Sequence, residues 1–289
     1  MSVDTTRTTA DTTRTTAPSR RTATRAWIAM YHSVAPFTEC ADDPYQITVT
    51  PDRLDEQLAR LRRRGLRGVS MAELLRARSE GAAHGLVGLT FDDGYRDFVD
   101  HALPLLRRHD CTATLFVLPG RLDGVNSWDP LGPRKPLLDA DGIRHAAASG
   151  MEVASHSLTH VDLTRADDEA LTREVHGSRT ALAELTGAAV EGFCYPYGYV
   201  DARVLSAVRD AGYRYACAID PGELAGDFAL PRVHIGQRDT PPRLWLKERL
   251  NRRRGRALPP ETVTGPPPAA ATEEPSAAVT GPPPETVHG

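Results

Sequence analysis

Residues 85–98 read GLVGLTFDDGYRDF, and this stretch decides the fold. The apolar run at 86–91 is typical of a buried strand. It ends on two adjacent carboxylates, Asp92 and Asp93, which are followed by Gly94. In a parallel barrel the functional site lies at the carboxyl ends of the strands. The stretch therefore predicts a barrel strand with a functional site at its end.

Strand-like and helix-like segments alternate on both sides of this stretch. The predicted strands cover residues 26–32, 86–91, 112–118, 151–156, 191–198, 213–219 and 229–235. The predicted helices cover residues 50–65, 96–108, 139–149, 166–187 and 201–212. Such alternation favours a parallel sheet with helical crossovers. Seven or eight units of this kind suit a closed or nearly closed (β/α) barrel better than a short open sheet.

Composition places the chain among ordinary globular proteins. Of the 289 residues, 40% are hydrophobic and 25% are charged, and the formal net charge is −3. A balance of this kind gives no global field that would attract nucleic acid or an anionic membrane. No apolar run approaches the roughly 20 residues of a transmembrane helix. We therefore expect neither a nucleic-acid partner nor a transmembrane segment, and the sequence leaves the oligomeric state open.

Two features bear on the cellular compartment. The N-terminal residues lack the apolar core of a signal peptide, so we expect a cytoplasmic protein unless the start site has been chosen wrongly. The four cysteines are widely spaced and form no CxxC pair; they are Cys40, Cys111, Cys194 and Cys217. Three of them have apolar neighbours, which predicts buried free thiols.

Short repeats mark both ends of the chain. DTTRTTA occurs twice within the first 17 residues, and VTGPPP occurs twice after residue 262. These segments contain too little apolar surface to offset the entropy cost of ordering. We therefore expect disordered tails at 1–25 and 257–289, with one catalytic domain at 26–256.

Polar side chains follow the predicted strands where each strand ends. They include Tyr31, His32, Asp92, Asp93, Ser155, His156, Tyr195, Tyr197 and His234. The run SHSLTH spaces His156 and His160 four residues apart, so that both imidazoles can reach one metal ion. Two histidines and one carboxylate suit a catalytic zinc site that keeps a position open for water.

Each of these short motifs has a simpler interpretation when it is taken alone. A His-x-x-x-His pair commonly lies on the surface of a helix, and Asp-Asp-Gly commonly marks a turn or a helix N-cap. A phosphatase-type nucleophile site is a further alternative, but its two aspartates are spaced by one residue and these are adjacent. The interpretation as one site depends on the motifs occurring together.

Taken together and in order, the motifs resemble a known family. LTFDDGYRDF, SHSLTH, YPYG and LPRVHI resemble the polysaccharide deacetylases with a NodB-homology domain, carbohydrate esterase family 4. MYHSVAP and the following ITVTPDRLDEQLARL resemble the branch that includes poly-N-acetylglucosamine deacetylases. The resemblance covers residues 27 to 240 or so. It implies a distorted (β/α) barrel of about seven parallel strands and hydrolysis of an N-acetyl group on an amino sugar, with release of acetate.

The resemblance also implies roles for individual residues. Asp93, His156 and His160 would bind a divalent metal, with zinc expected first and cobalt or nickel as alternatives. Asp92 would be the general base. The backbone N–H at Tyr197 would stabilise the oxyanion, with Tyr195 beside it at the substrate, and His234 would be the general acid.

The sequence departs from the family pattern at two positions. Cys194 stands where many members have an arginine that pairs with the catalytic aspartate, so we expect Arg232 to replace it as the partner of Asp92. His234 matches the last family motif only approximately, which leaves an ordinary buried or rim histidine as the alternative. His32 is a further candidate for the pocket, in contact with substrate or with a metal ligand.

Three functions remain open at this point. The first is a metal-dependent deacetylase of an N-acetylated poly- or oligosaccharide. The second is a deacetylase of a small cytoplasmic glycoconjugate or metabolite. The third is a non-catalytic carbohydrate-binding module on the same fold, which would be expected to lack a metal ligand or the base. Asp92, Asp93, His156 and His160 are all present, which favours an enzyme.

Overall fold

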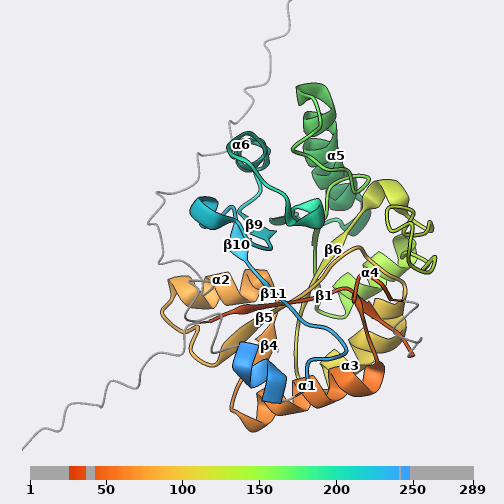
Figure 1. Cartoon of the computed structure of the whole chain (residues 1–289). Helices are drawn as coiled ribbons and strands as arrows, with labels where there is room; N and C mark the ends of the chain where they lie inside the picture. The colour runs from red at the N-terminus through yellow and green to blue at the C-terminus, as the bar shows by residue number, and fades with distance from the viewer. Residues whose placement is uncertain (1–25, 37–42, 241, 248–289) are drawn as a thin grey trace, which may run out of the picture.

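The computed structural model describes residues 26–36, 43–240 and 242–247 (Figure 1). The strands are β1 (Ile28–Tyr31), β2 (Ser33–Val34), β3 (Thr48–Val49), β4 (Arg67–Val69), β5 (Leu86–Phe91), β6 (Thr114–Val117), β7 (Glu152–Ser155), β8 (Gly192–Cys194), β9 (Tyr215–Ala218), β10 (Leu230–Pro231) and β11 (Val233–His234). The α-helices are α1 (Pro51–Arg63), α2 (Met71–Ser79), α3 (Leu103–Arg108), α4 (Ala140–Ala148), α5 (Asp168–Thr186) and α6 (Ala202–Asp210), and they lie around the outside of the strands (Figure 1).

The main sheet is parallel and nearly closed. Its strands follow the order β10-β9-β8-β7-β6-β5-β1-β11, with β4 paired to β5 off this path. The two ends of the path, β10 and β11, are consecutive in the chain and separated only by Arg232. One interrupted strand therefore pairs with β9 through its first half and with β1 through its second half, and it joins the two edges of the sheet. This confirms the predicted barrel of about seven parallel strands.

Buried apolar residues fill both faces of the strands, as expected for a parallel sheet covered by helices. In β5 every residue from Val87 to Phe91 is buried. Helix α1 begins where Thr50 accepts a hydrogen bond from the Arg53 N–H, and Pro51 occupies its first turn. Leu54, Leu58 and Leu61 on one face of α1 are buried in the core. The core thus holds the strands in place, and their carboxyl ends build the site.

The structure differs from the sequence prediction in four places. The strand–helix pair β4 and α2 was not predicted, and neither was the short pairing of β2 with β3. The predicted strand at 229–235 is interrupted at Arg232. The predicted helix at 96–108 begins with a π-helical turn at Phe98–Ala102. Pro104 has no N–H to donate to the carbonyl four residues earlier, and a wider turn accommodates this.

Several predictions concern residues outside the described ranges. Both tails, 1–25 and 257–289, lie there, as does the end of the predicted catalytic domain. Cys40 lies there as well, whereas Cys111, Cys194 and Cys217 are free and buried. Within the described ranges, none of the helices combines the length and the apolar character needed to cross a bilayer.

Candidate active site

A sharp turn after β5 brings two adjacent carboxylates to one site. Neighbouring side chains on an extended strand point to opposite faces. Asp93 leaves the extended conformation with a φ of 72°, and Gly94 follows with a φ of 66°. The turn lets the Asp92 and Asp93 side chains both face the pocket at the end of the strand, where both are buried. Left-handed backbone at a non-glycine residue is uncommon and costs free energy, and it recurs at functional sites.

Asp93 and two histidines form the candidate metal centre. The Asp93 Oδ1 atom lies 3.3 Å from His156 Nε2 and 3.3 Å from His160 Nε2. The three ligand atoms lie within 4.8 Å of one another, and all three side chains are buried. Ligands bound tetrahedrally to zinc at about 2.0–2.1 Å are themselves separated by roughly 3.3 Å. The spacing and the donor types therefore fit a divalent metal.

Hydrogen bonds behind the histidines set their orientation. His156 Nδ1 lies 2.9 Å from the Cys194 carbonyl oxygen, which can only accept, so Nδ1 carries a proton and Nε2 is the nitrogen that faces Asp93. His160 Nδ1 is buried and has no hydrogen-bond partner among the described residues. The His160 ring stacks on Trp128 at 4.4 Å and meets the Tyr197 ring edge-on at 4.6 Å. Both imidazoles are thus held in place around one point.

The electrostatic setting keeps Asp93 anionic. Burial by itself raises the pKa of this carboxyl, but hydrogen bonds from His156 and His160 outweigh burial and hold the pKa well below its usual range. An ionised carboxylate is the form that binds a metal.

Arg232 forms a two-pronged ion pair with Asp92. Arg232 Nη1 lies 2.6 Å from Asp92 Oδ1, and Nη2 lies 2.7 Å from Oδ2. Thr90 Oγ1 and the Ala218 carbonyl accept further hydrogen bonds from the guanidinium, and Cys194 Sγ lies 2.9 Å from Nη2. The Arg232–Asp92 contact that we expected from the sequence is present.

The same contact decides which carboxylate is free to bind metal. Burial by itself raises the pKa of the Asp92 carboxyl. The charge and the hydrogen bonds of Arg232 lower this pKa by more, so the net shift is downward. Asp92, His156 and Cys194 also lie close enough together to hold an ion. Both Asp92 oxygens, however, are already bonded to Arg232, and burial raises the pKa of the Cys194 thiol. The trio built on Asp93 is therefore the better metal site.

His234, the predicted general acid, and His32, the predicted pocket residue, line different pockets. His32 lines the pocket that contains Asp92, and its Nε2 atom lies 3.9 Å from Asp92 Oδ2. His234 lines a neighbouring pocket instead, and its ring centroid is 6.1 Å from that of His32. Burial, followed by the charges of His32 and Lys247, lowers the pKa of His234 to about 4.

The two tyrosines after β8 have different environments. Tyr195 is fully buried and its hydroxyl donates to the Phe228 carbonyl oxygen at 2.8 Å, which fixes its ring in the core. Tyr197 is 41% exposed, has a φ of 58° and lines the pocket beside His160. Both tyrosines line the pocket, but Tyr197 has an exposed side chain there, whereas the Tyr195 side chain is buried and its hydroxyl is bonded to Phe228.

Sequence reasoning missed part of the pocket wall. Asp129 lines the pocket, and burial together with the nearby Asp93 charge raises the pKa of its carboxyl. Tyr45, Ile47 and Ile219 also line the pocket. Asp129 lies in the irregular segment between β6 and α4, where no motif or periodicity marks it.

Comparisons with known proteins agree with this geometry. Residues 80–216 match the polysaccharide deacetylase family model. A chitooligosaccharide deacetylase of Rhizobium leguminosarum bv. trifolii is 34% identical over 135 residues, which is 46% of this chain and 56% of that protein. A poly-beta-1,6-N-acetyl-D-glucosamine N-deacetylase of Staphylococcus aureus is 19% identical and aligns with 65% of this chain and 68% of that protein.

A solved structure extends the likeness to the whole barrel. The Streptococcus pyogenes deacetylase PplD, solved in complex with acetate, superimposes with a TM-score of 0.67 and 25% identity. The match covers 78% of this chain and 99% of that one. By contrast, the first curated relatives are matched over little more than half of their length.

Proposed function

We propose that this chain, which contains a polysaccharide deacetylase domain at residues 80–216, is a metal-dependent hydrolase that removes N-acetyl groups from an amino sugar and releases acetate. One observation carries the proposal. Asp93, His156 and His160 surround a single point, and Asp92 stands beside them in the same pocket without sharing that point. Amide hydrolysis needs this division, in which one carboxylate holds a metal and another accepts a proton.

Asp93, His156 and His160 would hold the metal. Zinc fits this set of one oxygen and two nitrogen ligands, and cobalt or nickel fits it as well. Bound there, a divalent metal acts as a Lewis acid on the amide carbonyl and lowers the pKa of the attacking water.

Asp92 would be the general base. Arg232 keeps its carboxylate ionised and fixes both oxygens, so the side chain is oriented before substrate arrives. Asp92 loses some basicity through this pairing but gains a defined position, and position is the first requirement of a general base.

The departing amine needs a proton, and the geometry favours His32 as its donor. His32 lies in the pocket with Asp92, whereas His234 lies behind it. This revises the assignment of the acid to His234 that the motif order suggested. His234 would then support the His32 ring from the neighbouring pocket.

The turn at Pro196–Gly198 would bind the oxyanion. The left-handed conformation of Tyr197 sets the direction of the peptide N–H groups in this turn, and we propose that the N–H of Tyr197 donates to the developing negative charge. The rings of Trp128 and Tyr197 flank His160 and would provide aromatic faces for a sugar.

For the substrate, we propose an N-acetylated amino sugar within an oligo- or polysaccharide. The names of the matched relatives support this class, since they are deacetylases of chitooligosaccharide and of poly-N-acetylglucosamine. The alternative substrate is a small glycoconjugate. The two substrate classes differ in the length of the sugar chain that the pocket must accommodate.

Acetate release from a panel of sugars tests the proposal. The panel contains chitooligosaccharides, β-1,6-linked N-acetylglucosamine oligomers and free N-acetylglucosamine, each assayed after chelation and after zinc is added back. We expect acetate from an oligomer, loss of release on chelation and recovery with zinc. Binding of the oligomers by the zinc-loaded protein without acetate release would identify a carbohydrate-binding module instead.

A further inference from the structure

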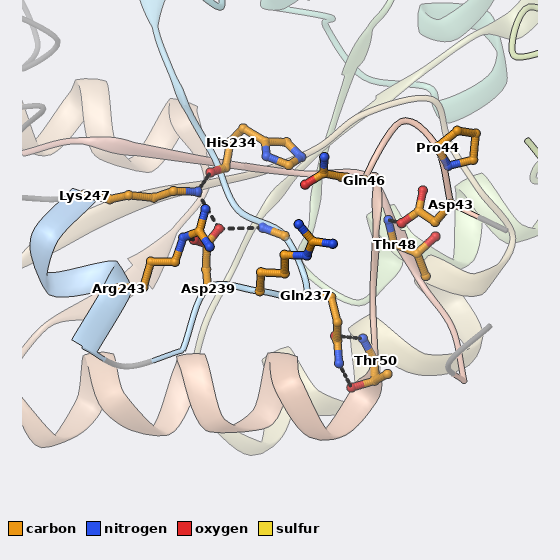
Figure 2. Close-up of a pocket in the computed structure, with 12 residues that line it drawn as sticks. Asp43, Pro44, Gln46, Thr48, Thr50, His234, Gln237, Asp239, Arg243 and Lys247 are labelled. Atoms are coloured by element: carbon orange, nitrogen blue, oxygen red, sulfur yellow. Dashed lines mark hydrogen bonds and ion pairs between the residues drawn. The ribbon is translucent and has the colours of Figure 1, made fainter. Parts of the chain in front are cut away.

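A second pocket of about 160 Å³ adjoins the candidate active site and has no role in the proposed reaction. Figure 2 shows it between the segment that carries Gln46 and Thr48 and the segment from His234 to Lys247. His234 lines this pocket, and its ring faces His32 on the active-site side. The two pockets are therefore neighbours with separate linings.

The segment at 44–50 separates the two pockets, because its side chains alternate between them. Tyr45 and Ile47 line the active-site pocket, whereas Gln46, Thr48 and Thr50 line the second pocket. From Ile47 to Thr50 this is the alternation of an extended chain, whereas residues 44–45 form a turn and Gln46 has a φ of 57°.

The two acidic groups of the second pocket already have partners. Asp239 is buried and bonds to the Gly236 N–H at 2.8 Å and to Lys247 Nζ at 2.5 Å, and Arg243 Nε lies 3.3 Å away (Figure 2). The Asp43 carboxylate accepts hydrogen bonds from the backbone N–H groups of residues 47 and 48 at 3.0 and 2.9 Å. Neither carboxylate needs a ligand cation.

Asp239 Oδ1 is buried and has only the Arg243 ion pair, and the other lining groups discussed here that lack a partner can donate hydrogen bonds. Arg238 lines the pocket, and no ion pair links it to a carboxylate of the described residues. Thr48 Oγ1 is buried and has no hydrogen-bond partner in the described part of the chain. A buried hydroxyl without a partner costs free energy unless a ligand or water satisfies it.

The pocket lining has a net positive formal charge. It carries three cations (Arg238, Arg243, Lys247) and two carboxylates (Asp43, Asp239), which leaves an excess of one positive charge.

We propose that this pocket binds a small oxyanion, a phosphate or carboxylate group, through the Arg238 guanidinium and the Thr48 hydroxyl. A guanidinium pairs with either anion in a two-pronged geometry, and a hydroxyl donates to either. The anion could be free in solution or attached to a sugar. Neither the metal ligands nor Asp92 belong to this pocket, so the proposal does not depend on the deacetylase chemistry.

Calorimetric titration with inorganic phosphate at low ionic strength tests the proposal. The full chain is titrated both zinc-loaded and chelated, because phosphate also binds zinc. We expect saturable binding in both forms. Arg238→Gln should weaken it by roughly tenfold or more, as expected for loss of a charged hydrogen bond. Thr48→Val, which keeps the side-chain shape, should weaken it by a smaller factor.

The matched control is Arg209→Gln on α6, which removes the same charge from an exposed arginine remote from this pocket. It should leave phosphate binding unchanged. Equal weakening by Arg209→Gln, binding seen only with zinc, or no binding at all would each overturn the proposal. Titrations with acetate and with N-acetylglucosamine 1-phosphate identify the source of the anion. Tighter binding of the sugar phosphate than of phosphate indicates a substituted sugar, and equal binding indicates a free anion.

Discussion

Arg232 and Asp92 are joined by two parallel contacts of 2.6 and 2.7 Å, although 140 positions separate them in the chain. Arg232 is also the single residue between β10 and β11, where the two edges of the sheet meet. The residue at the point where the barrel closes is therefore also the one that orients the proposed base.

Replacement of Arg232 by methionine should shift the acid limb of the pH–rate profile to higher pH. Arg232 lowers the pKa of Asp92, and without it burial, which raises that pKa, would dominate. The carboxylate would then become protonated at a higher pH as the solution is acidified. kcat/KM for acetate release measured against pH checks this, and Arg232→Lys should restore part of the shift. An unchanged acid limb in the methionine variant would rule out the pairing as a determinant of the base.

Removal of a metal ligand should lower the metal content of the purified protein together with its activity. Asp93→Asn, His156→Gln and His160→Gln each remove one ligand of the candidate site. Metal analysis by mass spectrometry and acetate release are measured on the same samples. His176→Gln is the control, because His176 is exposed on α5. Full metal content in all three ligand variants would place the metal elsewhere.

His32→Gln and His234→Gln should separate the proton donor from its neighbour. Loss of a general acid costs about 10²–10⁴-fold in rate, and we expect a loss of this size for His32→Gln only. An activated aryl acetate needs no proton on its leaving group, so the His32 variant should retain most of its activity on that ester. If His234→Gln shows the larger loss on the amide and the same rescue on the ester, the assignment reverses.

A pair of glycine substitutions tests the packing of the barrel. A methyl group at Gly192 in β8 would overlap with the Tyr215 hydroxyl, which donates to Glu152 at 2.7 Å. Gly192→Ala should therefore lower the free energy of unfolding by about 1–3 kcal/mol. Gly177 lies within α5, where an added methyl group meets only Leu158 at 3.6 Å, so Gly177→Ala should raise it by about 1 kcal/mol. Denaturant titration compares the two, and equal effects would contradict this packing.

The sequence predicted those parts of the molecule that local patterns determine. The apolar run at 86–91 followed by Asp92 and Asp93 identified both the strand and its functional end, and SHSLTH identified the histidines that lie beside Asp93. In each case the spacing along a strand or turn fixes the geometry, so few tertiary contacts are needed to infer it.

Other features depend on contacts between distant segments. β4 has only three residues and is recognisable as a strand through its pairing with β5. Asp129 reaches the pocket from an irregular segment that no periodicity marks. The order of His32 and His234 around Asp92 follows from the pairing of β1 with both β5 and β11, which no local motif encodes.

The alternating segment at 44–50 also limits how this protein can evolve. Inserting or deleting one residue in its extended part, 47–50, would exchange the two linings there, turning Thr48 toward the active-site pocket and Ile47 toward the second pocket. Length changes in this segment should therefore be tolerated only in steps of two, whereas substitutions on either face could adapt one pocket without disturbing the other.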